Sequence, residues 1–203
     1  MLDTFLRMPL KAIQAKRRAL SVSLIVNIFL VLSILLNLLL AWKVKSLENS
    51  LLYLKSEAAL SVGTLVPSIE AKDVDNHPAT IAYLGEGPPT VLYIFTPQCK
   101  WCARNMENIK ILADQAGGSH RFIGLSLSSD KLREYVADNK LGFPVYSELS
   151  PAFSTAYKVN GTPETLVISP EGRVLKKWAG AYTKDIQKEV EQYFKVKLPG
   201  IRP

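Results

Sequence analysis

The 203-residue chain has two cysteines, and they stand three positions apart in the run Cys99-Lys100-Trp101-Cys102. This run follows an apolar segment that ends at Phe95, and it opens a segment of helical character. At a helix N-terminus, unpaired backbone N–H groups and the helix dipole favour the thiolate of the first cysteine, which is the reactive form. Cys102 can then resolve a mixed disulfide formed at Cys99. The spacing therefore predicts reversible dithiol–disulfide chemistry.

Three other uses of the cysteine pair are open. A structural disulfide would close a loop too short to constrain much of the chain. Half of a zinc site would need further ligands, and the two histidines, His77 and His120, stand alone and far away in sequence. The thiols could also be inert and buried. We favour redox chemistry at Cys99 and Cys102, and we expect no metal and no cofactor.

A second candidate element is Thr162-Pro163, immediately before a predicted strand. A cis bond here would turn the backbone of Thr162 toward the sulfurs and leave its N–H and C=O free to pair with a substrate peptide. A trans proline that begins a strand is the simpler alternative. Trp101 offers an aromatic surface beside the sulfurs. We therefore expect Trp101, Thr162 and Pro163 to contact the substrate.

The elements that must position these residues follow from the pattern of apolar and turn-forming residues. Thr90–Phe95 lacks polar alternation, which predicts a central strand buried on both faces. We expect a helix at 130–139 and a last one from a Thr183 cap to Lys195. The other predicted elements are a helix at 100–115 and strands at 69–73, 79–83, 121–127, 164–169 and 173–179. This order predicts an α/β fold with a central mixed sheet flanked by helices.

The segment from Ala19 to Trp42 has no ionisable side chain. At about 1.5 Å per residue, its 24 residues reach roughly 36 Å, more than the hydrocarbon core of a bilayer. A cleavable signal peptide is the closest alternative, but its apolar region is usually about 7–15 residues long. We therefore predict an uncleaved transmembrane anchor at 19–42, after a cytoplasmic segment at 1–18.

The net charge of +7 and the pI near 9.4 could suggest nucleic-acid binding. However, residues 1–42 carry a net +4, including Lys16, Arg17 and Arg18 next to the apolar segment, whereas residues 43–203 carry only +3. Basic residues beside a span remain cytoplasmic, so the rest of the chain is expected outside the cytoplasm. The excess of basic residues therefore indicates how the chain is oriented in the membrane, and no nucleic-acid partner is expected.

Residues 43–61 are predicted to form a helical stalk before a globular domain at 62–203. Apolar residues in the stalk recur at alternating steps of three and four, the spacing of a coiled-coil seam: Val44, Leu47, Leu51, Leu54 and Ala58. Two heptads are compatible with a plain spacer helix or with a weak homodimer through the stalk.

The sequence resembles the thioredoxin-like superfamily, and more narrowly the membrane-anchored redoxins of the TlpA/ResA type or the MauD-like redoxins. The resemblance rests on the segment at Val66-Pro67 and on three longer runs, Phe95–Cys102, Val159–Pro163 and Leu166–Gly180. It implies a thioredoxin fold, with Cys99 as the attacking thiol, Cys102 as the resolving thiol and Pro163 as the cis-proline. We expect a single-pass protein of the bacterial cytoplasmic (inner) membrane with its domain in the periplasm.

The chain departs from these relatives at the positions that handle protons. Most relatives have a proline where this chain has Trp101, ResA-type members have a glutamate where it has Asn105, and thioredoxin has a buried acid where it has Tyr93. Glu107, Glu164 or water could replace the missing proton acceptor.

We therefore predict a membrane-anchored thiol–disulfide oxidoreductase that exchanges disulfides with protein partners outside the cytoplasm. A peroxiredoxin-like thiol peroxidase is one alternative, because Thr96-x-x-Cys99 resembles the peroxidatic motif, although Leu92 stands where that motif has a proline. A copper or assembly chaperone that binds metal through the two thiolates is another.

Overall fold

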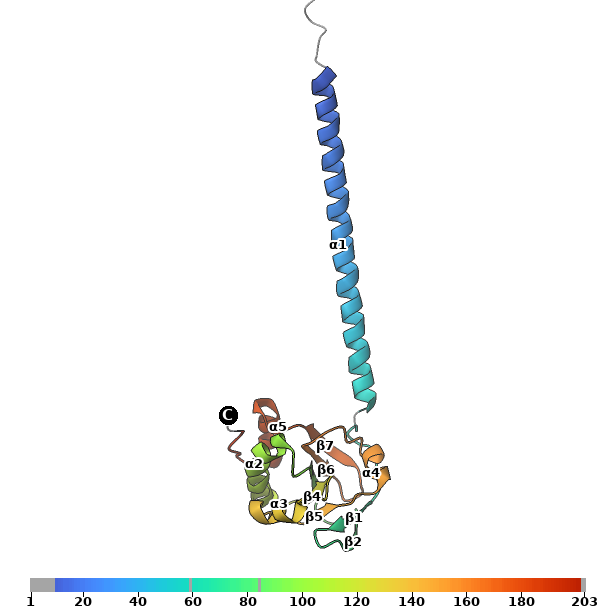
Figure 1. Ribbon diagram of the computed structural model, residues 1–203. Coiled ribbons are helices and arrows are strands. Elements are labelled where there is room, and N and C mark those ends of the chain that lie inside the picture. Colours follow the sequence, from blue (N-terminus) through green and yellow to red (C-terminus); the bar gives the residue numbers. More distant parts are fainter. Residues whose placement is uncertain (1–9, 59, 84, 202–203) are drawn as a thin grey trace, which may run out of the picture. The chain divides into compact units, whose positions relative to one another are not determined.

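The computed structural model describes residues 10–58, 60–83 and 85–201, with the backbone alone at 10–23 and 49–58 (Figure 1). The chain divides into two units between Ser56 and Glu57. The first unit is dominated by one helix, α1 (Leu10–Ala58), which runs through the predicted anchor and most of the predicted stalk. Residues 1–9 of the predicted cytoplasmic segment lie outside the described residues.

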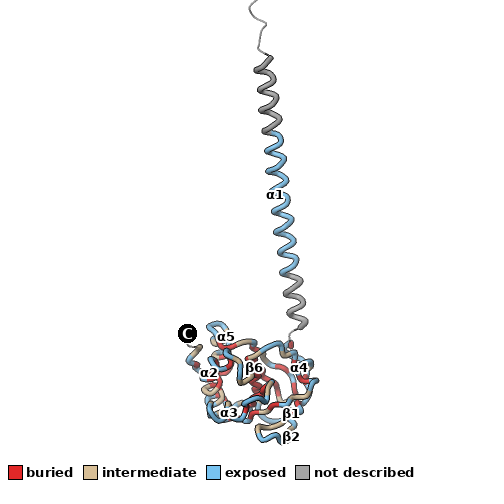
Figure 2. Tube along the Cα trace, viewed as in Figure 1, coloured by how far each residue is buried: buried red, intermediate tan, exposed pale blue. Residues whose placement is uncertain are grey.

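Within α1, Leu24–Glu48 is long and apolar enough to cross a membrane. The side chains of residues 24–48 are exposed, as the blue stretch in Figure 2 shows. Their large apolar side chains have no protein around them in which to bury their surface. In water such a surface is unfavourable, whereas in a bilayer it is matched by lipid.

The second unit is an α/β structure built on one sheet of seven strands. The strands are ordered β2-β1-β5-β4-β3-β6-β7. The central strands β3, β4 and β5 run parallel, and all other neighbours pair antiparallel, so the predicted mixed sheet is confirmed. The elements are β1 (Ile69–Asp73), β2 (Pro78–Ile81), β3 (Thr90–Phe95), α2 (Lys100–Ala116), β4 (Arg121–Ser126), α3 (Leu132–Asn139), β5 (Val145–Ser147), α4 (Pro151–Ala156), β6 (Glu164–Ile168), β7 (Val174–Ala179) and α5 (Lys184–Phe194).

The two faces of the sheet bury separate clusters of apolar side chains. Alternate residues of a strand point to opposite faces. Val91, Tyr93 and Phe95 of β3 accordingly pack with α2, α3 and α5, whereas Leu92 and Ile94 pack with α4 and the segment before β1. All six residues of β3 are buried, as predicted for a central strand. In Figure 2 the buried residues gather on the strands in the middle of this unit.

The structure differs from the sequence prediction in three places. It adds a short strand, β5, and a short helix, α4, between residues 140 and 160, where no element was predicted. The described helix ends at Ala58, and Leu60 already belongs to the core of the globular unit. Thr183 precedes α5 as predicted, but its hydroxyl makes no capping hydrogen bond, so the predicted cap is wrong in that respect.

Candidate redox site

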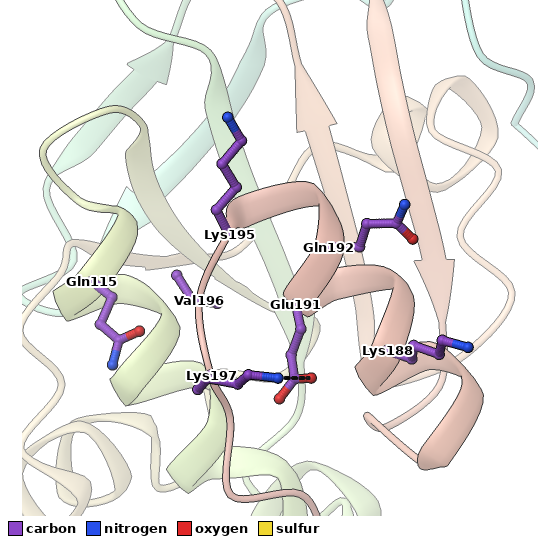
Figure 3. A pocket seen from close by; sticks show the side chains of 7 residues that line it. All are labelled: Gln115, Lys188, Glu191, Gln192, Lys195, Val196 and Lys197. Carbon is purple, nitrogen blue, oxygen red and sulfur yellow. Dashed lines mark ion pairs between the residues drawn. The ribbon is translucent and has the colours of Figure 1, made fainter.

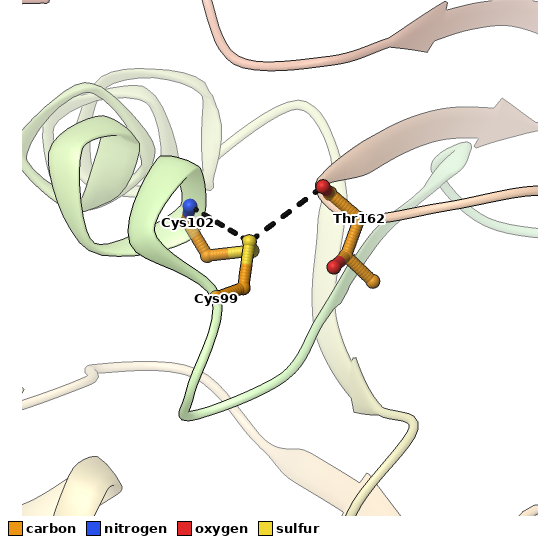
Figure 4. The surroundings of a disulfide bond; sticks show 3 residues. All are labelled: Cys99, Cys102 and Thr162. Carbon is orange, nitrogen blue, oxygen red and sulfur yellow. Dashed lines mark hydrogen bonds between the residues drawn. A yellow bond between two sulfur atoms is a disulfide. The ribbon is translucent and has the colours of Figure 1, made fainter.

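The two cysteines form a disulfide at the N-terminus of α2, with their Cα atoms 5.2 Å apart (Figure 4). Cys99 is the N-cap residue, and its Sγ accepts a hydrogen bond of 3.1 Å from the backbone N–H of Cys102. This is one of the orphan N–H groups that open a helix. A negative charge on the Cys99 sulfur would therefore be stabilised by this N–H and by the positive end of the helix dipole.

The two sulfurs differ in their access to solvent. Cys102 is fully buried in the core beneath α2, whereas Cys99 is half-buried. A disulfide or thiol from outside therefore cannot reach the sulfur of Cys102, whereas Cys99 is partly open to solvent. The structure thus separates an outer and an inner cysteine.

Thr162 and Pro163 lie beside the outer cysteine. The peptide bond between them is cis. The carbonyl oxygen of Thr162 is 3.6 Å from the Cys99 Sγ (Figure 4). In the disulfide this sulfur bears no hydrogen, so the contact becomes a hydrogen bond only when Cys99 is a thiol. Pro163 is buried, and its carbonyl oxygen accepts a 2.8 Å hydrogen bond from the N–H of Gly180.

A buried ion pair lies next to this loop. The carboxylate of Glu164, the residue after Pro163, is 2.9 Å from the ammonium of Lys177, and both side chains are largely buried. Glu164 also accepts a 3.3 Å hydrogen bond from the N–H of Asn160, and Lys177 donates one of 3.0 Å to the carbonyl oxygen of Lys158. Both charges are therefore tied to the loop that carries Thr162.

Sequence reasoning named Glu164 only as a proton acceptor and did not identify Lys177. Side chains alternate along β6: Thr165 bonds to Tyr182 on the α2 face, so Glu164 points to the opposite face. Cys102 belongs to the core on the α2 face. Glu164 is thus placed to hold the loop rather than to reach the inner sulfur.

Trp101 is half-exposed between the two cysteines. Its side chain is 50% exposed, and the guanidinium carbon of Arg104 lies 4.9 Å from the centre of its ring. Such a cation–π contact holds the ring against the helix, while half of the residue's surface stays open to solvent. Trp101 is therefore available as an apolar contact surface next to Cys99.

Where an acid could accept a proton from the dithiol, the chain has the amide of Asn105, one helical turn after Cys102, and the phenol of Tyr93 on β3. Asn105 is fully buried, and its Oδ1 accepts a 3.0 Å hydrogen bond from the N–H of Tyr182. Burial raises the pKa of Tyr93 well above its ordinary value, so the phenol stays neutral. Glu107 is exposed on the outer side of α2. Neither Asn105 nor Tyr93 can act as a proton acceptor in the way a carboxylate does.

The loop before α2 adjoins a polar groove at the carboxyl-terminal ends of the parallel strands. Leu127 donates a 2.9 Å backbone hydrogen bond to Phe95, and Gln98 donates one of 2.9 Å to the carboxylate of Asp130. Serines predominate among the residues that line the groove: Ser126, Leu127, Ser128, Ser129, Glu148, Leu149, Ser150, Pro151, Phe153 and Ser154.

A second hollow lies between the far end of α2 and the end of α5 (Figure 3). Three lysines surround it, and the ammonium of Lys197 is 3.7 Å from the carboxylate of Glu191. Gln115 on its wall stands 13 residues after Cys102 on α2, which corresponds to about 20 Å along the helix. This hollow is therefore not part of the dithiol site.

One group of possible metal ligands lies elsewhere among the described residues. Donor atoms of Asp73, at the end of β1, and of Asp75 and His77, in the exposed turn that follows, lie within 4.8 Å of one another. Their side chains already have protein partners, because His77 contacts Asp73 at 3.1 Å and Arg133 contacts Asp75 at 2.6 Å. This cluster is a turn stabilised by hydrogen bonds and by the ion pair between Arg133 and Asp75.

The AhpC/TSA family model matches residues 62–177, which is more than half of the chain. The chain belongs to the AhpC/TSA family. The matched segment contains both cysteines, the Thr162–Pro163 bond, Glu164 and, as its last residue, Lys177. A search of curated proteins found no match.

Solved structures support the fold of this family member. The thioredoxin domain of a thiol-disulfide oxidoreductase from Bacteroides vulgatus has a TM-score of 0.56 at 15% identity, covering 67% of this chain and 99% of that domain. A thioredoxin-family thiol:disulfide interchange protein from Chlorobium tepidum has a TM-score of 0.53 at 18% identity, covering 67% and 99%. StoA from Bacillus subtilis has a TM-score of 0.50 at 20% identity, covering 63% and 98%. The predicted thioredoxin-like fold is therefore confirmed.

Proposed function

We propose that this AhpC/TSA-family chain is a membrane-anchored thiol–disulfide oxidoreductase that exchanges disulfides with protein partners outside the cytoplasm. The observation that carries the proposal is the half-buried residue Cys99 at the start of α2, which is disulfide-bonded to the buried Cys102 and has its sulfur 3.6 Å from the Thr162 carbonyl oxygen. A purely structural disulfide would not need one sulfur open to solvent beside a polar backbone group.

In the reduced protein, the Cys99 thiolate attacks one sulfur of a substrate disulfide. A bond forms between Cys99 and that sulfur, and the other substrate sulfur leaves as a thiolate that takes a proton from water. Cys102 then attacks the Cys99 sulfur as a thiolate and releases the second substrate thiol. The substrate gains two electrons, and the Cys99–Cys102 disulfide forms. The same steps in reverse oxidise a substrate dithiol.

We propose a role for each of the three residues expected to contact the substrate. Trp101 would contact the side chains that flank the reacting sulfur. Thr162 would pair with the substrate backbone, as an extended peptide pairs with an exposed strand edge. Pro163, buried and bonded to Gly180, would fix the end of the loop that presents Thr162.

The membrane anchor and the orientation that we propose for the chain rest on α1. Its apolar, exposed stretch at Leu24–Glu48 suits a bilayer, and the basic cluster before it favours a cytoplasmic N-terminus. The globular unit would then lie in the periplasm of a bacterium, where disulfides persist. Several similar structures bear names of thiol–disulfide enzymes, which supports the proposed chemistry.

The test is disulfide exchange by the full chain in detergent, with insulin as the substrate and dithiothreitol as the electron source. We expect the native chain to accelerate insulin reduction and Cys99→Ser to abolish the acceleration. Equal rates for the two proteins would refute the proposal. A parallel assay with hydrogen peroxide tests the peroxidase alternative, for which the native chain would consume peroxide and Cys99→Ser would not.

A further inference from the structure

Two polar side chains of the apolar stretch of α1 lie on one face of the helix. Asn37 stands four residues after Ser33, and its Nδ2 donates a 2.8 Å hydrogen bond to the Ser33 carbonyl oxygen. Residues four apart are neighbours on a helix surface. Both residues are exposed, so in a membrane-spanning helix they would face lipid or another helix.

This face continues the predicted seam of the stalk. Counting back from Leu47 in alternating steps of three and four gives Val44, Leu40, Asn37, Ser33 and Leu30. α1 is continuous over all of these residues, so the seam keeps its register from the stalk into the span. Asn27, the remaining polar residue between Leu24 and Leu40, falls one position off this seam.

Asn37 would be poorly satisfied as a lone residue in lipid. In the part of the chain that the structure describes, its carboxamide has only the bond to Ser33, which uses one of two N–H groups and leaves Oδ1 without a partner. Asn37 lies about 10 Å from the middle of the 19–42 segment, within the hydrocarbon half-thickness of about 15 Å. No water is present there to complete its hydrogen bonds.

We propose that this seam pairs with the same seam of a second copy of the chain, with the Asn37 carboxamides bonded to each other across the interface. The inference rests on the proposed membrane anchoring. Two copies inserted in the same orientation are parallel, and a two-fold axis between them puts each seam residue opposite itself. A carboxamide carries both a donor and an acceptor, so it can bond to its own copy reciprocally. A polar residue on such a seam fixes register and partner number.

The experiment is oxidative cross-linking of the full chain in native membranes. The background is Cys99→Ser with Cys102→Ser, so that the only thiol is an introduced one. Leu40→Cys places that thiol on the seam, and Leu39→Cys places it off the seam as a control. We expect disulfide-linked dimers from Leu40→Cys and a background amount from Leu39→Cys.

Asn37→Leu and Asn27→Leu, each added to Leu40→Cys, form a matched pair, because both replace an asparagine in the span. We expect Asn37→Leu to lower the cross-linked fraction at least fivefold and Asn27→Leu to leave it unchanged within twofold. Equal yields from the two variants, or equal yields from Leu40→Cys and Leu39→Cys, would overturn the proposal.

Alkaline extraction of the same membranes separates this inference from the proposed anchoring. Chains that stay in the membrane pellet but do not cross-link at residue 40 would overturn the pairing and leave the anchor intact. Chains released into the supernatant would overturn the anchor and, with it, the pairing. Insulin reduction by the native chain in detergent reports on the dithiol independently of both.

Discussion

The sulfur of Cys99 lies 3.6 Å from the carbonyl oxygen of Thr162, a residue 63 positions further along the chain. The contact joins the start of α2 to the loop before β6. It is possible because β3, which leads to Cys99, pairs directly with β6, with Ile94 opposite Glu164. One strand pair of the sheet therefore places the proposed nucleophile, Cys99, beside the backbone group that we propose to hold its substrate.

The difference in exposure between the two sulfurs gives the first prediction. Cys102→Ser should accumulate a stable mixed disulfide with a substrate protein, because Cys99 can still attack but nothing resolves the product. The adduct is measured by non-reducing electrophoresis and mass spectrometry after reaction with an oxidised substrate. Cys99→Ser is the control and should form none. Adducts on Cys102 of the Cys99→Ser variant would reverse the assigned roles.

Trp101 gives the second prediction. Trp101→Ala should lower kcat/KM for a disulfide peptide by about tenfold, which corresponds to about 1.4 kcal/mol of lost contact energy. The reduction potential of the cysteine pair, measured against a glutathione buffer, should not change. Because the ring is half-exposed, the melting temperature should change little.

Leu175→Ala is a matched control for Trp101, because Leu175 is an exposed apolar residue on β7 (36% exposed). It should leave kcat/KM unchanged. If both variants lose activity equally, the effect is not specific to contact beside the dithiol.

Local sequence signals were sufficient to predict the dithiol. A run of β-branched and aromatic residues at Thr90–Phe95, followed by Cys99 at a helix start, predicts a buried strand and a cysteine pair at a helix N-terminus without knowledge of the rest of the chain. The strands β6 and β7 and the helix α5 could likewise be predicted from local residue types. These elements form within one or two residues of the predicted bounds.

Other features depend on contacts that sequence patterns do not encode. The strand β5 has only three residues, too few for a period to show, and it exists because β1 and β4 pair with it on either side. The short helix α4 is an exception, because Ser150-Pro151 is a helix-start pattern from which it could have been predicted. The ion pair of Glu164 and Lys177 depends on the register between β6 and β7, which includes an irregularity at Val167 and Ile168.

That ion pair gives the third prediction. Lys177→Met leaves the Glu164 carboxylate buried without its counter-charge, which should destabilise the globular unit by about 3 kcal/mol. The double variant Glu164→Gln with Lys177→Met removes both charges and keeps an acceptor for the Asn160 N–H, so it should be more stable than Lys177→Met alone. Urea unfolding at pH 7, followed by tryptophan fluorescence, measures both. A double variant less stable than the single one would show that the carboxylate does not need its partner.

The last prediction concerns pH. Burial lowers the pKa of His120 below its ordinary value of 6.5, and the ring packs edge-on against Phe194 at 4.9 Å. The unfolded chain therefore binds a proton at this residue at a higher pH than the folded chain does, and stability falls as the pH drops through 6.5 toward the folded pKa. His120→Phe keeps an aromatic ring and removes the titration, so its melting temperature should fall less than that of the native chain between pH 7.5 and pH 5.

The carboxylates do not account for a change in this interval. Those with lowered pKa values in the folded chain, Asp73, Glu171 and Glu191, titrate there below their ordinary values of 3.8 and 4.5, outside the interval. If the melting temperatures of the two proteins fall by the same amount between pH 7.5 and pH 5, the loss of stability is not caused by the protonation of His120.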